Sequence, residues 1–168
     1  RGAVGGAPPA EERWRGLPLD ERGLVSRTRM LPAWEGSDMD VTFLGTASCL
    51  PSVSRSTSCL ALRRNGVVWL FDGGECSQLQ LQRSQVKVGR VDRIFVTHLH
   101  GDHSFGLPGL LCMMGQNRER DAPPVEVFGP AGLRLYLRAS IQLTYSRIAP
   151  PYRVHELHGV PLLMRGDQ

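Results

Sequence analysis

The residues of this chain that could do chemistry gather in one short segment. His98, His100 and His103 lie there with Gly101 and Asp102, in the order Thr-His-Leu-His-Gly-Asp-His. Imidazole nitrogen and carboxylate oxygen are donors that a hydrolytic zinc ion takes, and glycine lets the backbone turn sharply between them. In a tight loop, His98 and His100 can point to one metal ion while Asp102 and His103 point to a second, about 3.5 to 4 Å away. The alternative is a surface loop that is merely rich in histidine.

The element that must position this segment is an apolar strand expected at residues 93–97, directly before the ligands. Asn65-Gly66 predicts a hairpin between strands at residues 59–62 and 67–71. Further strands are expected at residues 41–44, 125–128 and 152–157, and helices at residues 75–86 and 105–114, the second interrupted by Pro108. A last helix follows Gly132, with apolar positions at Leu133, Leu137, Ile141 and Tyr145. Strands that alternate with helices predict an α/β fold.

Composition suits one soluble domain and excludes several classes of protein. The chain has 168 residues, 41% hydrophobic and 21% charged, with no apolar run long enough for a membrane span and no secretory signal, so we expect a cytoplasmic or nuclear protein that does not enter a membrane. Its four cysteines form no CxxC pair, which argues against a zinc ribbon or a disulfide framework. The net charge of +4 rests on 19 arginines and one lysine, a composition that suits phosphate contacts but does not establish nucleic-acid binding.

The first 38 residues differ from the rest of the chain. Residues 1–38 are rich in Gly, Pro, Ala and Arg and hold six basic and six acidic residues, which predicts a disordered leader and argues against a mitochondrial transit peptide. Met39 precedes the first convincing strand and is a reasonable natural start. We therefore expect the folded domain at residues 39–168.

The histidine segment and its flanks resemble the metallo-β-lactamase superfamily, and within it the short-form tRNase Z family. The resemblance runs from Met39 to about Leu157. It is carried by Asp40-Val-Thr-Phe-Leu-Gly-Thr46, Pro51-Ser52 with Arg55, Trp69-Leu-Phe-Asp72, the histidine segment, Phe105-Gly-Leu-Pro-Gly-Leu-Leu111 and Phe128-Gly-Pro130. The histidine segment identifies the superfamily, whereas the last two segments are more particular to tRNase Z.

This resemblance implies the N-terminal half of an αββα sandwich, with a mixed sheet and flanking helices. It implies an endoribonuclease that removes 3′ trailers from precursor tRNA, with two zinc ions in each complete subunit and a homodimer as the complete protein. His98 and His100 would bind the first zinc, and Asp102 and His103 the second. Asp102 would also accept the proton of the attacking water. Asp72 would stand behind the site and fix a ligand histidine, or instead cap the helix expected at residues 75–86.

Two departures and one gap distinguish this chain from the family. Ala47 and Cys76 replace family glycines, which costs stability or substrate contact if either position needs a positive φ. A catalytic zinc takes three protein ligands, but the segment offers two for each metal, so we expect an incomplete site. Near the C-terminal end, His158 is either a further ligand or a surface residue, and Asp167 is the one candidate for the aspartate that bridges both metals in the family.

We therefore expect a truncated half that is inactive and poorly stable, because the sheet face with Phe43, Phe71 and Phe95 would lack its cover. The alternatives are another hydrolase of the superfamily, acting on thioesters or lactams, and a non-catalytic fragment that at most binds metal.

Overall fold

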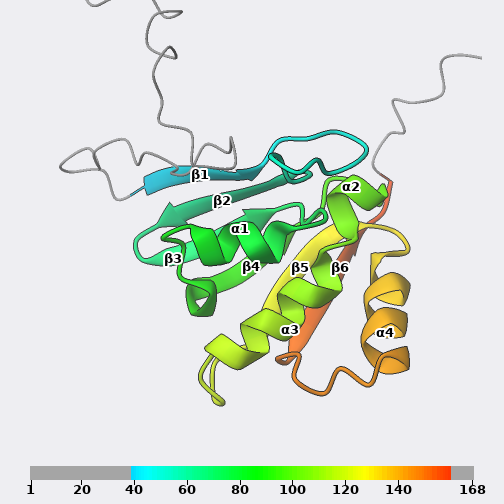
Figure 1. Cartoon of the computed structure of the whole chain (residues 1–168). Helices are drawn as coiled ribbons and strands as arrows, with labels where there is room; N and C mark the ends of the chain where they lie inside the picture. Colours follow the sequence, from blue (N-terminus) through cyan, green and yellow to red (C-terminus); the bar gives the residue numbers. More distant parts are fainter. Residues whose placement is uncertain (1–38, 160–168) are drawn as a thin grey trace, which may run out of the picture. The chain divides into compact units, whose positions relative to one another are not determined.

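The computed structural model describes residues 39–159, which form a mixed six-stranded sheet with helices packed on it (Figure 1). The strands are β1 (Met39–Gly45), β2 (Cys59–Arg64), β3 (Val67–Phe71), β4 (Val91–Phe95), β5 (Val125–Pro130) and β6 (Tyr152–Leu157), and they lie side by side in this order. The expected fold class is confirmed. The predicted leader at residues 1–38, Asp167 and the end of the expected domain lie outside the described residues.

The strand directions decide where the connections run. β1, β2 and β3 pair antiparallel, whereas β3, β4, β5 and β6 are parallel neighbours. Parallel neighbours need crossover connections, and these hold α1 (Ser77–Arg83), α3 (Leu107–Asn117) and α4 (Leu133–Leu143). A 3-10 helix at Val88–Arg90 directly precedes β4, and a short helix, α2 (Gly101–Ser104), follows β4. The carboxyl ends of β3, β4, β5 and β6 therefore share one edge of the sheet.

The two faces of the sheet have different surroundings, because successive side chains of a strand point to opposite faces. Leu70, Ile94 and Val127 are fully buried and belong to one core with the helix residues Leu110 and Leu137. This is the face that the helices cover.

The opposite face carries a row of stacked rings that is only half-buried. The ring centroids of Phe71 and Phe95 lie 5.1 Å apart, as do those of Phe95 and Phe128, and His155 stacks on Phe128 at 4.6 Å. Phe43, at the far side of the sheet, is 67% exposed. As expected from the sequence, the described residues leave this aromatic face without a complete cover.

Local backbone chemistry explains where the predicted elements hold and where they shift. Asn65 and Gly66 both have positive φ, 50° and 78°, so the predicted hairpin turn is confirmed. The first predicted helix is too long, because Cys76 adopts a left-handed φ of 66° and α1 begins only after it. Pro108 does not interrupt α3 but lies in its first turn, where a missing N–H costs nothing. Tyr145 lies beyond the end of α4 and is exposed, so its assignment to the apolar helix face was wrong.

Candidate metal centre at the carboxyl edge of the sheet

The histidine segment begins where β4 ends, at the carboxyl edge of the parallel strands. Val96 still donates its backbone N–H to Phe128 at 2.7 Å, and the chain then turns into α2 at Gly101. The turn after β3 packs directly against α2, since Gly73 donates its N–H to the carbonyl of His103 at 2.8 Å. A Cβ at Gly74 would lie 2.1 Å from the carbonyl oxygen of Asp102, so only glycine permits this approach. The two turns therefore hold each other in place.

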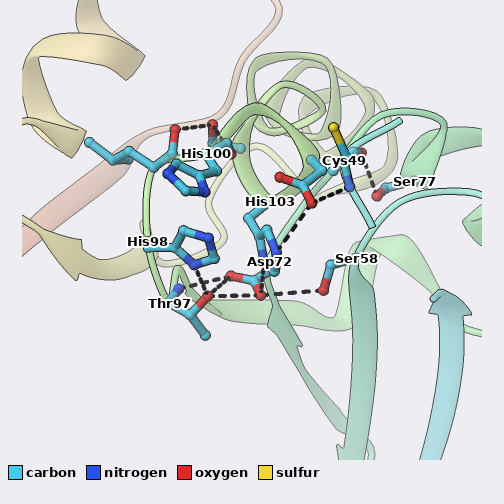
Figure 2. Close-up of polar contacts among 12 residues, drawn as sticks. Cys49, Ser58, Asp72, Ser77, Thr97, His98, His100 and His103 are labelled. Atoms are coloured by element: carbon cyan, nitrogen blue, oxygen red, sulfur yellow. Dashed lines mark hydrogen bonds and ion pairs between the residues drawn. The ribbon is translucent and has the colours of Figure 1, made fainter. Parts of the chain in front are cut away.

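The structure brings the three predicted histidines of the segment together. The ring centroids of His98 and His100 lie 4.7 Å apart, and those of His98 and His103 lie 4.0 Å apart (Figure 2). His98 and His103 are half-buried, whereas His100 is exposed. Three imidazoles thus share one small volume at the edge of the sheet, and they remain open to solvent.

Asp72 lies beneath these rings and binds two residues of the β4 side. Its Oδ2 lies 2.7 Å from Nδ1 of His103, and its Oδ1 accepts hydrogen bonds from the backbone N–H of Thr97 at 2.8 Å and the Thr97 hydroxyl at 2.9 Å (Figure 2). Ser58 adds a longer contact of 3.4 Å. A carboxylate only accepts hydrogen bonds, so in this contact Nδ1 of His103 is the donor, and in the neutral ring Nε2 then keeps its lone pair.

The alternative role of Asp72 as a helix cap is wrong. The residue at the N-cap of α1 is Cys76, and no side chain caps that end. Asp72 is turned toward β4 by its own left-handed backbone, with a φ of 59°. Its buried carboxylate therefore bonds to His103 and Thr97 and does not bond to the end of α1.

Asp102 is held by a residue that sequence reasoning missed. The backbone N–H of Cys49, in the loop after β1, donates to Oδ2 of Asp102 at 2.7 Å, and the same oxygen lies 3.6 Å from Nε2 of His103. The hydrogen bond from Cys49 is the main reason why the pKa of Asp102 lies below the usual value of an aspartate, and the nearby His103 and His100 lower it further. Asp102 is thus kept in the ionised form that a metal ligand needs.

Two other residues brace the loop from below, and neither was predicted. Ser104 is buried, and its hydroxyl donates to the carbonyls of His100 at 2.9 Å and Leu99 at 3.2 Å. Tyr136 of α4 donates its hydroxyl to the carbonyl of Ser104 at 3.0 Å. These bonds fix the backbone on which His100 and His103 stand.

The donor types at this site fit a zinc ion, but the described residues supply only part of a ligand set. In residues 39–159 no group of three or more His, Cys, Asp or Glu side chains is placed so that it could hold a metal ion. His155 points elsewhere, since it bonds to Glu126 on the aromatic face. His158 lies just beyond the end of β6 and is exposed. The residues able to take part in a metal centre here are His98, His100, Asp102 and His103.

The chain is similar to one family model and to several curated proteins. The family model described as anti-Pycsar protein Apyc1 matches residues 39–139. The chain is 50% identical over 121 residues to zinc phosphodiesterase ELAC protein 1 of Bos taurus, a match that covers 71% of this chain and 33% of that protein. It is 46% identical over 121 residues to ribonuclease Z of Microcystis aeruginosa, covering 71% and 37%. The chain thus spans about a third of the length of these curated relatives.

Two solved structures are also similar to this chain. The crystal structure of the short form of human tRNase Z superposes with a TM-score of 0.66 at 48% identity, covering 69% of this chain and 44% of that one. The metallo-β-lactamase fold protein YhfI from Bacillus subtilis, at 19% identity, superposes with a TM-score of 0.54 over 70% of this chain and 47% of that one, which supports the fold alone. Among the described residues no helix is long and apolar enough to cross a membrane.

Proposed function

This chain belongs to the family described as anti-Pycsar protein Apyc1, and from its similarity to ribonuclease Z we propose that it forms part of a zinc-dependent endoribonuclease that removes 3′ trailers from precursor tRNA. The expected resemblance to the N-terminal half of a short-form tRNase Z is confirmed by relatives named ribonuclease Z and by the human tRNase Z structure. The observation that carries the proposal is the cluster of three imidazoles and one carboxylate at the end of β4, inside the region that the family model matches.

The metal would be held by His98 and His100 on one side and by Asp102 and His103 on the other. When bound, zinc polarises a phosphoryl oxygen and makes water acidic enough to react near neutral pH. Support comes from the name zinc phosphodiesterase of the relatives and from the donor types of the cluster. Each complete subunit would hold two zinc ions. The remaining ligands would lie outside residues 39–159 and would bring each ion to the usual three protein donors.

The residues of this chain would each have a separate task around that metal. Asp102, held in place by the N–H of Cys49, would accept the proton of the attacking water. Asp72 would keep the proton of His103 on Nδ1, so that Nε2 stays available as a ligand. Thr97 would keep Asp72 in place, since it donates both its N–H and its hydroxyl to the same carboxylate.

Precursor tRNA as the substrate, a homodimer as the complete assembly, and the cytoplasm or nucleus as the place of action belong to the same proposal. The relatives named ribonuclease Z support an RNA substrate. The cysteines are all free, which suits a reducing compartment.

The metal assignment is tested by zinc content. The double variant His98→Ala/His100→Ala should lose the zinc that the parent chain carries after gel filtration, as measured by elemental analysis. The matched control is His155→Ala/His158→Ala, which removes two histidines away from the cluster and should retain zinc. Equal zinc in the parent and in the His98/His100 variant would overturn the assignment.

The reaction is tested with 3′-extended precursor tRNA, using this chain and the same chain extended by the C-terminal part of a ribonuclease Z relative. Only the extended form should cleave at the trailer, because the described residues hold part of the ligands. Hydrolysis of a thioester or a lactam without RNA cleavage would favour another hydrolase of the fold. Zinc binding without any hydrolysis in the extended form would favour a non-catalytic fragment.

A further inference from the structure

We propose that the groove between α4 and β6 binds phosphates of an RNA strand and that Arg138 is the residue that contacts them. The inference extends the proposed function, because it adds a binding surface for the RNA outside the metal cluster. It stands on the shape, the charge and the position of this groove.

The groove is a cavity of about 530 Å³ at the end of the sheet, where α4 lies beside β6 (Figure 1). Its lining is mostly cationic or aromatic: Arg134, Arg138, Tyr152, Arg153, Val154 and His155. A second cavity of about 660 Å³ continues along α4 and shares Arg134 and Arg138 with the first. The two arginines therefore line both hollows; no carboxylate lines the first, whereas Glu156 lines the second.

The charges of the groove leave one cation without a partner. Arg153 pairs with Glu126 at 3.4 Å. Arg134 donates its side chain to the carbonyl of Val154 at 2.8 Å, and its backbone N–H to Glu156 at 2.9 Å. Arg138 is exposed, and within residues 39–159 it has neither a hydrogen bond nor an ion pair. A guanidinium that is free and lies in a concave surface matches the bidentate geometry of a phosphate.

The lining also suits the bases of a single strand. Tyr152 brings an aromatic ring to the groove, and bases stack on such rings without regard to sequence, whereas the ring of His155 stacks on Phe128 at the other face of the sheet. Burial raises the pKa of Tyr152, so its hydroxyl remains a neutral hydrogen-bond donor. A peptide of acidic residues alone would use the arginine but would gain nothing from the ring of Tyr152, which is why RNA is the better fit.

The second cavity begins beside the histidine segment, because Gly132 lines it. Gly132, the N-cap of α4, lies against Leu99 of the histidine segment, where a Cβ on Gly132 would be 3.4 Å from Cδ1 of Leu99. From Gly132 to Arg138 the helix advances by six residues, or about 9 Å. Arg138 therefore lies less than two turns along α4 from the N-cap that contacts the histidine segment, on the path of a strand that runs from the cluster along this helix.

The test is the affinity for fluorescently labelled precursor tRNA, measured by anisotropy in EDTA so that no hydrolysis contributes. Arg138→Glu should weaken binding about tenfold and lower the slope of log affinity against log salt by about one. Arg83→Glu is the matched control, because it makes the same charge change on an exposed residue of α1, far along the sheet from α4, and should alter affinity less than about twofold. Arg138→Gln should give a smaller loss than Arg138→Glu, and circular dichroism checks that each variant is folded.

Equal losses in the Arg138 and Arg83 variants, or no loss in the Arg138 variant, would overturn the inference. So would a polyglutamate competitor that binds as tightly as RNA with the same dependence on Arg138, since that would be a site for acidic peptides. His98→Ala/His100→Ala should lose zinc and keep RNA binding. If the cleavage assay fails while RNA binding is intact and depends on Arg138, the proposed function is rejected, but the RNA-binding role of the groove is still supported.

Discussion

Replacing Asp72 by asparagine should weaken metal binding more than it weakens the fold. The new amide has nearly the same shape, and its oxygen still accepts the N–H of Thr97. Its NH₂ group, however, would face Nδ1 of His103. In the variant the amide would donate to Nδ1, whereas in the parent chain Nδ1 donates to the carboxylate over 2.7 Å. His103 must then carry its proton on Nε2, the nitrogen that faces Asp102 and the cluster.

The magnitudes follow from the bonds of this buried carboxylate, which is 5% exposed. Exchanging a charge-assisted hydrogen bond for a neutral one should cost about 1 to 1.5 kcal/mol of the free energy of unfolding. Loss of a partner that orients a ligand histidine typically lowers metal affinity about 10- to 100-fold. Asp72→Ala would instead leave buried donors unpaired and should cost about 3 to 5 kcal/mol, enough to unfold a marginal domain.

The assay pairs urea unfolding with a zinc titration against a chromophoric chelator, and ¹⁵N NMR reports which nitrogen of His103 carries the proton. Asp40→Asn is the control, since it alters an exposed carboxylate that pairs with Arg63. It should cost at most about 1 kcal/mol and leave zinc affinity unchanged. The reasoning is refuted if Asp72→Asn and Asp40→Asn lower zinc affinity equally, or if the proton stays on Nδ1 in the Asp72 variant.

Three further outcomes are expected. Iodoacetamide should label the exposed Cys49 and Cys76 in the native chain but reach Cys59 only after unfolding, because burial raises the pKa of that thiol to about 12; mass spectrometry with and without urea checks this. Cys76→Gly should stabilise the chain by about 0.5 to 1 kcal/mol in urea, because glycine tolerates the left-handed backbone there; an unchanged midpoint would contradict it. Hydrogen bonds from the backbone N–H groups of Arg134 and Gly132 lower the pKa of Glu156, so its stabilisation of α4 is present above the usual glutamate pKa and is lost as the pH falls through the lower folded value. Amide exchange in α4 from pH 6 to pH 3 should show this loss in the parent chain, and Glu156→Gln should remove it.

Local signals were sufficient for much of the fold. Asn65-Gly66 forces a hairpin because both residues accept a positive φ, and the β-branched and aromatic run of β3 was predicted with its full bounds. The donor types and spacing of the histidine segment predicted a cluster after a buried strand, and the structure places its rings together. Each of these features depends on residues that are close in sequence, so periodicity and turn chemistry were enough.

Helix ends were less predictable for a related reason. A helix was expected at residues 75–86, but the backbone of Cys76 is left-handed and that of Ser84 is extended, so α1 is shorter than predicted. In α3 the same proline that breaks a helix interior is accepted in the first turn. The apolar pattern alone predicts neither the shortened α1 nor the position of the proline in α3.

The support of the site was decided by tertiary structure alone. Asp102 receives its hydrogen bond from Cys49, which is 53 residues away, through a backbone N–H that every residue except proline possesses. Tyr136 reaches the carbonyl of Ser104 across 32 residues because α4 packs beside α3 on the same face of the sheet. Asp72 meets His103 because β3 and β4 are parallel neighbours whose carboxyl ends share one edge. The sequence determined which donors exist, whereas the order of the strands determined which of them touch. Every residue except proline has a backbone N–H, so the sequence does not show which one will bind a given carboxylate. A contact between residues far apart in the sequence forms only once the sheet has formed.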